Sequence, residues 1–249
     1  MIPDGYFWDP DLKLGEETGA LTKLVWPNYL IEASDISEPS LKFEITHEEL
    51  IRRFPVWGIR RASDQKLVAY GHGILVAADL TQNQLPDSGW RFAMESVLAE
   101  PKPNCMCLLV ANVDPAARGL GFSKVLVEKA KAVTLDLGFK EMIAPVRPTL
   151  KQDFPEQTLD EYIQKRDEKN EVFDPWLKLH VRLGGEVLNV CHESVIINAT
   201  IKKWSQWLSA EFHQSGKYIL PMGLAPLDIN LEKNIGTYVE PNVWVRYLL

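Results

Sequence analysis

The sequence predicts a mixed α/β fold in a single domain, and three observations support this prediction. Short apolar stretches typical of strands alternate with amphipathic segments in the order hairpin, strand, helix, strand, helix, strand. Apolar residues make up 46% of the 249 residues, enough to bury a sizeable core, and no internal repeat is present. We expect one domain over residues 1–249, with an N-terminal extension (1–45), a core (46–200), and a C-terminal helix and closing strand (201–249).

Charge and cysteine content argue against several classes of protein. The net charge is −7, from 34 acidic and 27 basic side chains, so repulsion opposes binding to nucleic acid or anionic membranes. The sequence has no run of about 18 apolar residues, so it predicts no transmembrane helix. The N-terminus does not resemble a secretory signal. Cys105 and Cys107 alternate within an apolar stretch, which favours buried, reduced thiols over a metal pair. We expect a cytoplasmic protein without a metal.

The first half of the predicted core begins with a helix and a hairpin. Thr46 and Glu49 form a capping box before an amphipathic stretch that Pro55 ends, which predicts a short helix. Residues 56–62 and 66–78 are rich in apolar and β-branched side chains and flank a polar turn. They predict two antiparallel strands.

A central strand and a long helix are predicted next. Residues 80–104 form a long connection with one helix around 90–99. Residues 105–113 are almost continuously apolar, as in a strand buried on both faces. Apolar side chains then recur at helical spacing over 120–137, and Gly138 supplies the stop.

The remaining elements follow from similar signals. Residues 140–146 predict a strand that contains Pro145, which cannot donate a ladder hydrogen bond, so we expect one side of this strand to be unpaired there. Thr158 and Glu161 form a second capping box, which predicts a helix extending to about Asn170. The later segments are a helix over 174–185, a strand over 186–199, a helix over 202–208 and a closing strand over 236–249.

The junction between strand 105–113 and helix 120–137 is the clearest functional signal. The first amides of a helix have no partners within the helix, and its dipole is positive at that end. Gly119 and Gly121 allow a bulky anion to approach the backbone, and Arg118 and Lys124 add positive charge. A glycine-containing helix start is also common without a ligand. A Walker loop and a dinucleotide fingerprint are excluded, because the required residues are absent.

The string from Val113 through Pro115, Arg118, Gly119 and Gly121 to Leu126 resembles motif A of the GNAT superfamily of acyl-CoA transferases. It is slightly compressed before the arginine, and Ser123 stands in the last small-residue position. The resemblance covers residues 45–200, most specifically 105–190.

The GNAT resemblance implies a fold and a ligand. In that family, the two strands beside this helix splay apart at an acyl-CoA cleft, with helices on both faces of a mixed sheet, which accounts for Pro145. It also implies that the CoA pyrophosphate is bound by Val113, Arg118, Gly119, Leu120, Gly121, Ser123 and Lys124. Acetyl-CoA, malonyl-CoA or another acyl-CoA would be the co-substrate.

Three further residues are candidates for the reaction site. Many GNAT enzymes carry a tyrosine where this chain has His180, and the imidazole could act as an acid or donate a hydrogen bond to a thioester carbonyl. Thr149 follows strand 140–146 and could donate its hydroxyl, and Trp26 could form a wall of the acyl pocket. Packing or turn-capping roles are the alternatives for all three.

The same three residues are similar to those of the GNAT-like loading domains of polyketide synthases. That resemblance implies decarboxylation of malonyl-CoA and transfer of acetyl to an acyl carrier protein. An amine acetyltransferase instead needs a route to deprotonate an ammonium, for which Glu193 and Asp228 are candidates. We therefore expect an acyltransferase acting on a small-molecule amine or a thiol, with the decarboxylase and a non-catalytic CoA-binding module as alternatives.

Overall fold

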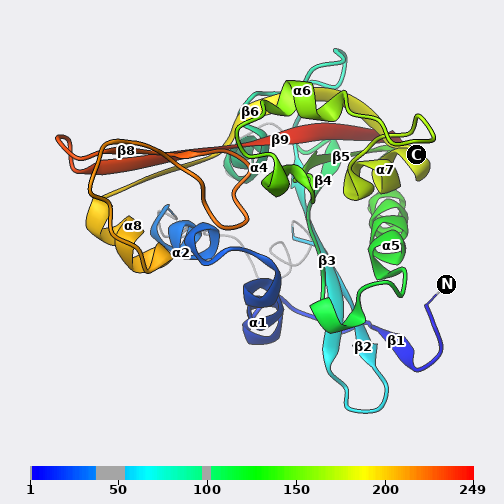
Figure 1. Cartoon of the computed structure of the whole chain (residues 1–249). Helices are drawn as coiled ribbons and strands as arrows, with labels where there is room; N and C mark the ends of the chain where they lie inside the picture. The colour runs from blue at the N-terminus through cyan, green and yellow to red at the C-terminus, as the bar shows by residue number, and fades with distance from the viewer. Residues whose placement is uncertain (1, 38–53, 97–101) are drawn as a thin grey trace.

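The computed structural model describes residues 2–37, 54–96 and 102–249, and within them one large sheet organises the chain (Figure 1). The sheet has nine strands in the order β1-β2-β3-β4-β5-β9-β8-β7, and β6 also pairs with β9. The strands are β1 (Tyr6–Asp9), β2 (Val56–Arg61), β3 (Leu67–Val76), β4 (Cys105–Val113), β5 (Glu141–Val146), β6 (Glu186–Ala199), β7 (Gly216–Tyr218), β8 (Leu227–Asn230) and β9 (Ile235–Leu248). The helices are α1 (Glu16–Val25), α2 (Asn28–Ser37), α4 (Gly89–Ser96), α5 (Phe122–Asp136), α6 (Leu159–Ile163), α7 (Pro175–Arg182) and α8 (Ile201–Leu208).

The sheet opens between its two parallel strands. β4 and β5 are in register only at Met106–Met142 and Cys107–Ile143, although both strands continue further. Pro145 lies beyond these pairs, so it has no partner on β4. On its β9 side it is in register with Trp244. The side of the proline that we predicted to be unpaired is therefore the β4 side, which faces the gap. A gap at the carboxyl ends of two neighbouring parallel strands is a characteristic place for a ligand in an α/β sheet.

Helices cover both faces of the sheet, as expected. On one face, α5 packs over β3 and β4, and Trp57 Nε1 of β2 donates to the α5 carbonyl of Leu126 at 3.2 Å. On the other face, the Thr22 hydroxyl of α1 lies 2.6 Å from the Tyr70 hydroxyl of β3. Tyr70 and its neighbour Gly71 face opposite sides, as strand residues do, and Gly71 leaves room for the Trp57 ring. This arrangement confirms the mixed α/β prediction.

Most predicted elements are confirmed, with shifts of a few residues at their ends. One exception is the helix predicted from Thr158 to about Asn170, which ends at Ile163. The capping box forms, but Asp167 accepts hydrogen bonds from the amides of Lys169 and Glu171, which bends the chain into a turn. The other exception is the helix predicted after Thr46, which lies outside the described residues.

The two ends of the chain contain elements that the sequence pattern did not predict. α1 and α2 lie within the N-terminal extension, and β7 and β8 form a hairpin within the C-terminal segment. Tyr29 of α2 packs against Trp204 of α8 and Tyr238 of β9, with ring centroids 5.9 and 5.5 Å apart. Thus α2 packs against the C-terminal segment, whereas α1 packs against β3 and β4. In the described ranges, no helix has the length and apolarity needed to cross a bilayer.

Candidate functional site

The turn before α5 is built so that its backbone faces outward. Asp114 accepts a hydrogen bond from the Ala116 amide at 2.8 Å and from Lys66 Nζ at 2.7 Å, which fixes the end of β4. Gly119 and Gly121 follow with φ of 83° and 81°, a conformation that suits glycine. The sequence therefore folds into two left-handed glycine positions directly at the start of a 15-residue helix.

The start of α5 is open. Arg118, Gly119, Leu120 and Gly121 are exposed, and no heavy atom lies within 4 Å of a Cβ built on either glycine. No side chain caps the helix at Gly121. Amides at this end are therefore free to bind an anion.

The other predicted residues of the turn are distributed around this opening. Val113 is buried at the end of β4 and Ser123 is half-buried in the first turn of α5. Lys124 is exposed and lies 3.6 Å from Glu128 one turn later, whereas Arg118 has no ion-pair partner among the described residues. The fit to a pyrophosphate thus rests on backbone amides and on one unpaired guanidinium.

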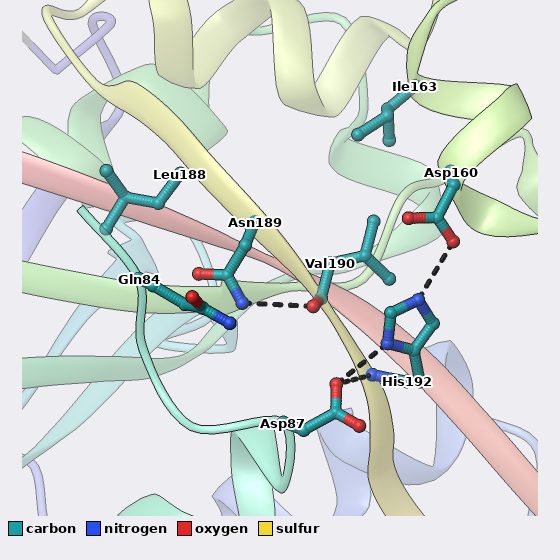
Figure 2. A pocket seen from close by; sticks show the side chains of 8 residues that line it. All are labelled: Gln84, Asp87, Asp160, Ile163, Leu188, Asn189, Val190 and His192. Atoms are coloured by element: carbon teal, nitrogen blue, oxygen red, sulfur yellow. Dashed lines mark hydrogen bonds and ion pairs between the residues drawn. The ribbon is translucent and has the colours of Figure 1, made fainter.

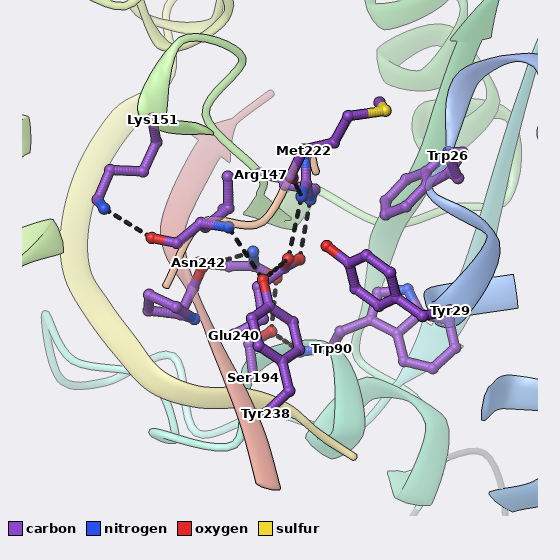
Figure 3. Close-up of polar contacts among 12 residues, drawn as sticks. Trp26, Tyr29, Trp90, Arg147, Lys151, Ser194, Met222, Tyr238, Glu240 and Asn242 are labelled. Carbon is purple, nitrogen blue, oxygen red and sulfur yellow. Dashed lines mark hydrogen bonds and ion pairs between the residues drawn. The ribbon is translucent and has the colours of Figure 1, made fainter. Parts of the chain in front are cut away.

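Trp26 lies across the gap between β4 and β5. Its Nε1 donates to Asn112 Oδ1 of β4 at 2.8 Å. The guanidinium of Arg147, the residue directly after β5, lies 5.7 Å from its ring centroid (Figure 3). The structure therefore places Trp26 at the cleft, where it can form a wall.

Arg147 belongs to a buried polar cluster at the end of β5. It donates to both carboxylate oxygens of Glu240, from Nε at 2.9 Å and from Nη2 at 3.0 Å. Glu240 on β9 is almost fully buried and also accepts the Tyr238 hydroxyl at 2.6 Å. Burial and the neighbouring Glu240 charge raise the pKa of Tyr238, so the phenol stays protonated as the donor.

A loop from the C-terminal hairpin is held against this cluster. Arg147 Nη2 donates to the Met222 carbonyl at 2.5 Å, and Lys151 Nζ donates to the Leu224 carbonyl at 2.6 Å. The Leu224 amide in turn donates to the Tyr238 hydroxyl at 2.9 Å. Residues 221–224, which we call the cleft loop, are therefore fixed beside the end of β5 and the first half of β9 (Figure 3).

His180 lies on the buried face of α7 and contacts the sheet. Its Nδ1 is 2.6 Å from the Tyr247 hydroxyl of β9, and its ring packs edge-on to Trp176. Nε2 is buried and has no hydrogen-bond partner among the described residues. Burial lowers the pKa of His180 to about 3, so the ring is neutral at physiological pH.

Thr149 is exposed in the segment that follows β5, close to the start of α7. The amide of the next residue, Leu150, donates to Asp174 Oδ2 at 2.8 Å, and Asp174 caps α7 through the amides of Trp176 and Leu177. No hydrogen bond of the described residues joins Thr149 to His180. The structure thus places His180 on α7 and Thr149 next to a residue that binds the α7 cap, without a hydrogen bond between the two.

The residues that sequence analysis missed are those of the polar cluster, chiefly Glu240, Tyr238 and Asn112. One signal was present: Tyr238, Glu240 and Asn242 alternate along β9, so three polar side chains project from one face of an otherwise apolar strand. All three are buried. Polar groups are retained in such places only when they have partners, which indicates a network at that face.

A separate cavity of about 540 Å³ lies between α6, β6 and the segment before α4 (Figure 2). None of the predicted site residues lines it. His192 lies at its edge, 2.8 Å from Asp87 and 2.9 Å from Asp160. The hydrogen bond to Asp160 is the largest cause of a raised pKa of His192. The ring therefore links two segments that flank the cavity.

Comparison with known proteins supports acyltransferase chemistry. No protein-family model matches the chain. The chain is 26% identical over 248 residues to the arginine N-acetyltransferase avaD of Aspergillus versicolor, and the alignment covers 89% of this chain and 84% of that protein. The loading GNATL domain of CurA from Lyngbya majuscula has a TM-score of 0.57 at 16% identity, over 98% of this chain and 97% of that one. The GphF GNAT-like decarboxylase, solved with isobutyryl-CoA, has a TM-score of 0.47 at 16% identity, over 88% and 92%. The similarity to the CurA domain, with its TM-score of 0.57, confirms the predicted GNAT fold.

Proposed function

We propose that this chain, which has the GNAT fold, transfers an acyl group from acyl-CoA to a small-molecule amine. The observation that carries the proposal is the open, uncapped start of α5 beside the gap between β4 and β5. The first feature suits the pyrophosphate of CoA, and the second gives room to the extended arm that carries the thioester. The similarity to an arginine N-acetyltransferase along most of the chain supports an amine as acceptor.

In this proposal, the amides at the start of α5 and the guanidinium of Arg118 bind the pyrophosphate. Charge-assisted hydrogen bonds to phosphate are roughly twice as strong as neutral ones, so a few open amides contribute substantial affinity. Val113, Gly119, Leu120, Gly121, Ser123 and Lys124 complete the cofactor site. β4 and β5 then flank the acyl arm, and Trp26 forms a wall at the far side of the gap.

His180 is proposed as a neutral hydrogen-bond donor. When the Tyr247 hydroxyl donates to Nδ1, the proton of the ring is on Nε2, which has no partner among the described residues. Leaving a buried donor unpaired costs about 1–3 kcal/mol. Because Nε2 is buried, the side chains around it must move before a thioester carbonyl oxygen can accept its hydrogen bond and remove that cost. Donors aimed at such an oxygen stabilise the negative charge that develops during acyl transfer. Thr149 is proposed as a second donor from the end of β5.

A second candidate function is decarboxylation of malonyl-CoA with transfer of the acetyl group to the thiol of a carrier protein. The neutral state of His180 favours decarboxylation as a candidate, because loss of carbon dioxide leaves an enolate, which needs hydrogen-bond donors and no base. A CoA-binding module without turnover is the third candidate function.

Two carboxylates were considered as bases for amine transfer. Glu193 lies 3.8 Å from Arg91 of α4, and Asp228 is exposed on β8.

Incubation with acetyl-CoA and malonyl-CoA in separate reactions tests the proposal. Thiol release and carbon dioxide are measured, with and without a panel of amines that includes arginine and polyamines. We expect acetyl-CoA to be consumed only when an amine is present. Decarboxylation of malonyl-CoA together with unreactive acetyl-CoA would instead support the second candidate.

His180→Phe separates both enzymes from the binding module. We expect turnover to fall by at least about 100-fold while CoA-dependent thermal stabilisation is retained. His213→Phe is the control, because His213 is highly exposed and pairs only with Glu211. Equal activity of the two variants would remove His180 from the reaction site.

A further inference from the structure

The cluster at the end of β5 carries an unbalanced positive charge. Lys151 is buried there, with 1% of the residue exposed, and Arg147 is partly buried, with 15% of its side chain exposed. Burial lowers the pKa of Lys151 to about 8, and the charge of Glu240, which also pairs with Arg147, opposes that shift. Below about pH 8, two cations therefore share one anion. Buried charge without a counter-charge is costly, so the site favours a further anion.

One nitrogen of the Arg147 guanidinium is left for a ligand. Nε and Nη2 donate to Glu240 and to the Met222 carbonyl. Nη1 makes no hydrogen bond or ion pair among the described residues, and it is not one of their fully buried unpaired atoms. Because three bonds fix the rest of the guanidinium, this nitrogen is held in place before a ligand arrives, which lowers the entropy lost on binding.

The walls beside Nη1 are suited to an amino-acid-sized molecule. The Trp26 ring lies on one side of the guanidinium, at 5.7 Å. Met222 of the cleft loop lies next to the guanidinium through its carbonyl, with 42% of its surface exposed (Figure 3). Its φ of 60° is unusual for a residue other than glycine, and the bond from Arg147 helps to hold it. Apolar walls around one fixed charge are typical of small-molecule sites.

We propose that Arg147 Nη1 binds a carboxylate of the acyl acceptor, so that the amine substrate is an amino acid. This inference rests on the proposed function and narrows its acceptor. The guanidinium gives one charge-assisted hydrogen bond to the carboxylate, and the added anion balances the cluster. Neither proton transfer nor covalent chemistry is assigned to Arg147. It fixes the position of the acceptor relative to the thioester in the gap.

Matched pairs of substrates test this inference. Arginine and agmatine, and lysine and cadaverine, differ by the carboxylate alone. With acetyl-CoA as donor, we expect kcat/KM to be at least about 10-fold higher for each amino acid than for its decarboxylated partner. Calorimetry on the CoA-bound protein should show the same ranking in Kd. A ratio near one for both pairs would overturn the inference and leave the acyltransferase proposal standing.

Variants test whether Arg147 causes the preference for substrates with a carboxylate. Arg147→Met alone leaves Glu240 unpaired, so the double variant Arg147→Met with Glu240→Gln is used, which keeps an acceptor for Tyr238. In this variant, we expect the ratio of kcat/KM for each amino acid to kcat/KM for its decarboxylated partner to fall to within about 3-fold of one. Arg61→Met, which breaks a surface pair with Asp64, should keep the wild-type ratio. An unchanged ratio in the folded double variant would show that another group binds the carboxylate.

A failure of the proposed function has a different signature. If no amine consumes acetyl-CoA while malonyl-CoA is decarboxylated, the amine acceptor itself is refuted, and the inference about its carboxylate is refuted with it. If amino acids and their decarboxylated partners react equally well, only the inference that Arg147 binds a carboxylate is refuted.

Discussion

The two halves of the cleft are built in different ways. The half that we propose to bind the phosphates is one continuous segment from Asp114 to Lys124, exposed at residues 118–121 and shaped by two glycines. The acceptor half is assembled from α1 and its neighbours, the end of β5, β9 and the cleft loop, and its polar groups are buried. The first half depends on backbone that stays free of partners, whereas the second depends on side chains that satisfy one another. A mutation should therefore weaken ligand binding in the first half and protein stability in the second.

The largest effect is expected from Glu240→Gln. This change leaves Arg147 as a buried cation without its carboxylate, and breaking a buried pair costs about 3–5 kcal/mol. Urea unfolding should show most of that loss. Adding Arg147→Met should recover a large part, because the unpaired charge is then removed. Equal stability of the single and double variants would contradict the ion pair as the centre of the acceptor half.

Gly121→Asp tests the phosphate-binding half. The new carboxylate would face the bound pyrophosphate, and like charges about 4 Å apart repel by roughly 4 kcal/mol at a protein surface. CoA should then no longer raise the melting temperature. Gly138→Asp is the matched control, since Gly138 also has a positive φ of 84° and open space around it, but lies at the other end of α5. If both variants respond to CoA alike, the cofactor is bound elsewhere.

Trp26→Phe should have a smaller effect at the boundary between the halves. It removes the hydrogen bond to Asn112, worth about 1 kcal/mol, and keeps an aromatic wall. The midpoint of thermal unfolding should fall by about 2–4 °C. Trp207→Phe is the comparison, because Trp207 Nε1 is buried and has no partner in the described part of the chain, so its loss should not destabilise. Equal shifts would show that the Trp26 bond contributes little.

The smallest effect is expected from His192, which lies outside both halves. Its pKa is raised in the folded state, so the protonated ring adds stability below pH 6.5, and this is lost as the pH rises through the folded pKa. Because the side chain is 57% exposed, the contribution should stay under about 1 kcal/mol. His192→Gln should flatten the stability profile between pH 6 and 8 and leave CoA binding unchanged. A steeper profile in the variant would contradict the assignment.

The turn before α5 could be predicted from sequence because its signals are local. A strand, two glycines and a helix within about 30 residues determine the turn, and the positive φ of Gly119 and Gly121 follows from the need for an open helix start. Pro145 likewise indicated an unpaired side before the gap was seen. The position of Trp26 at the cleft was expected from resemblance alone, and the contacts with Asn112 and Arg147 now give it a physical basis.

The acceptor half could not be predicted because its contacts join distant parts of the chain. Arg147 and Glu240 are 93 residues apart, and Trp26 and Asn112 are 86 apart. No sequence pattern predicted α1 and α2, because packing against distant segments stabilises them: α1 contacts β3 and β4, and Tyr29 of α2 packs against Trp204 and Tyr238. The protonation state of His180 depends on burial under Trp176 and Tyr247, which no spacing reveals.

Amide chemical shifts recorded during a CoA titration test the central claim most directly. If the pyrophosphate is held by the start of α5, the ¹⁵N–¹H resonances of Gly119 to Lys124 should show the largest changes, and pantetheine, which lacks the phosphates, should leave them nearly unmoved. Saturable CoA binding with its largest shifts elsewhere, such as around the cavity beside His192, would contradict the account.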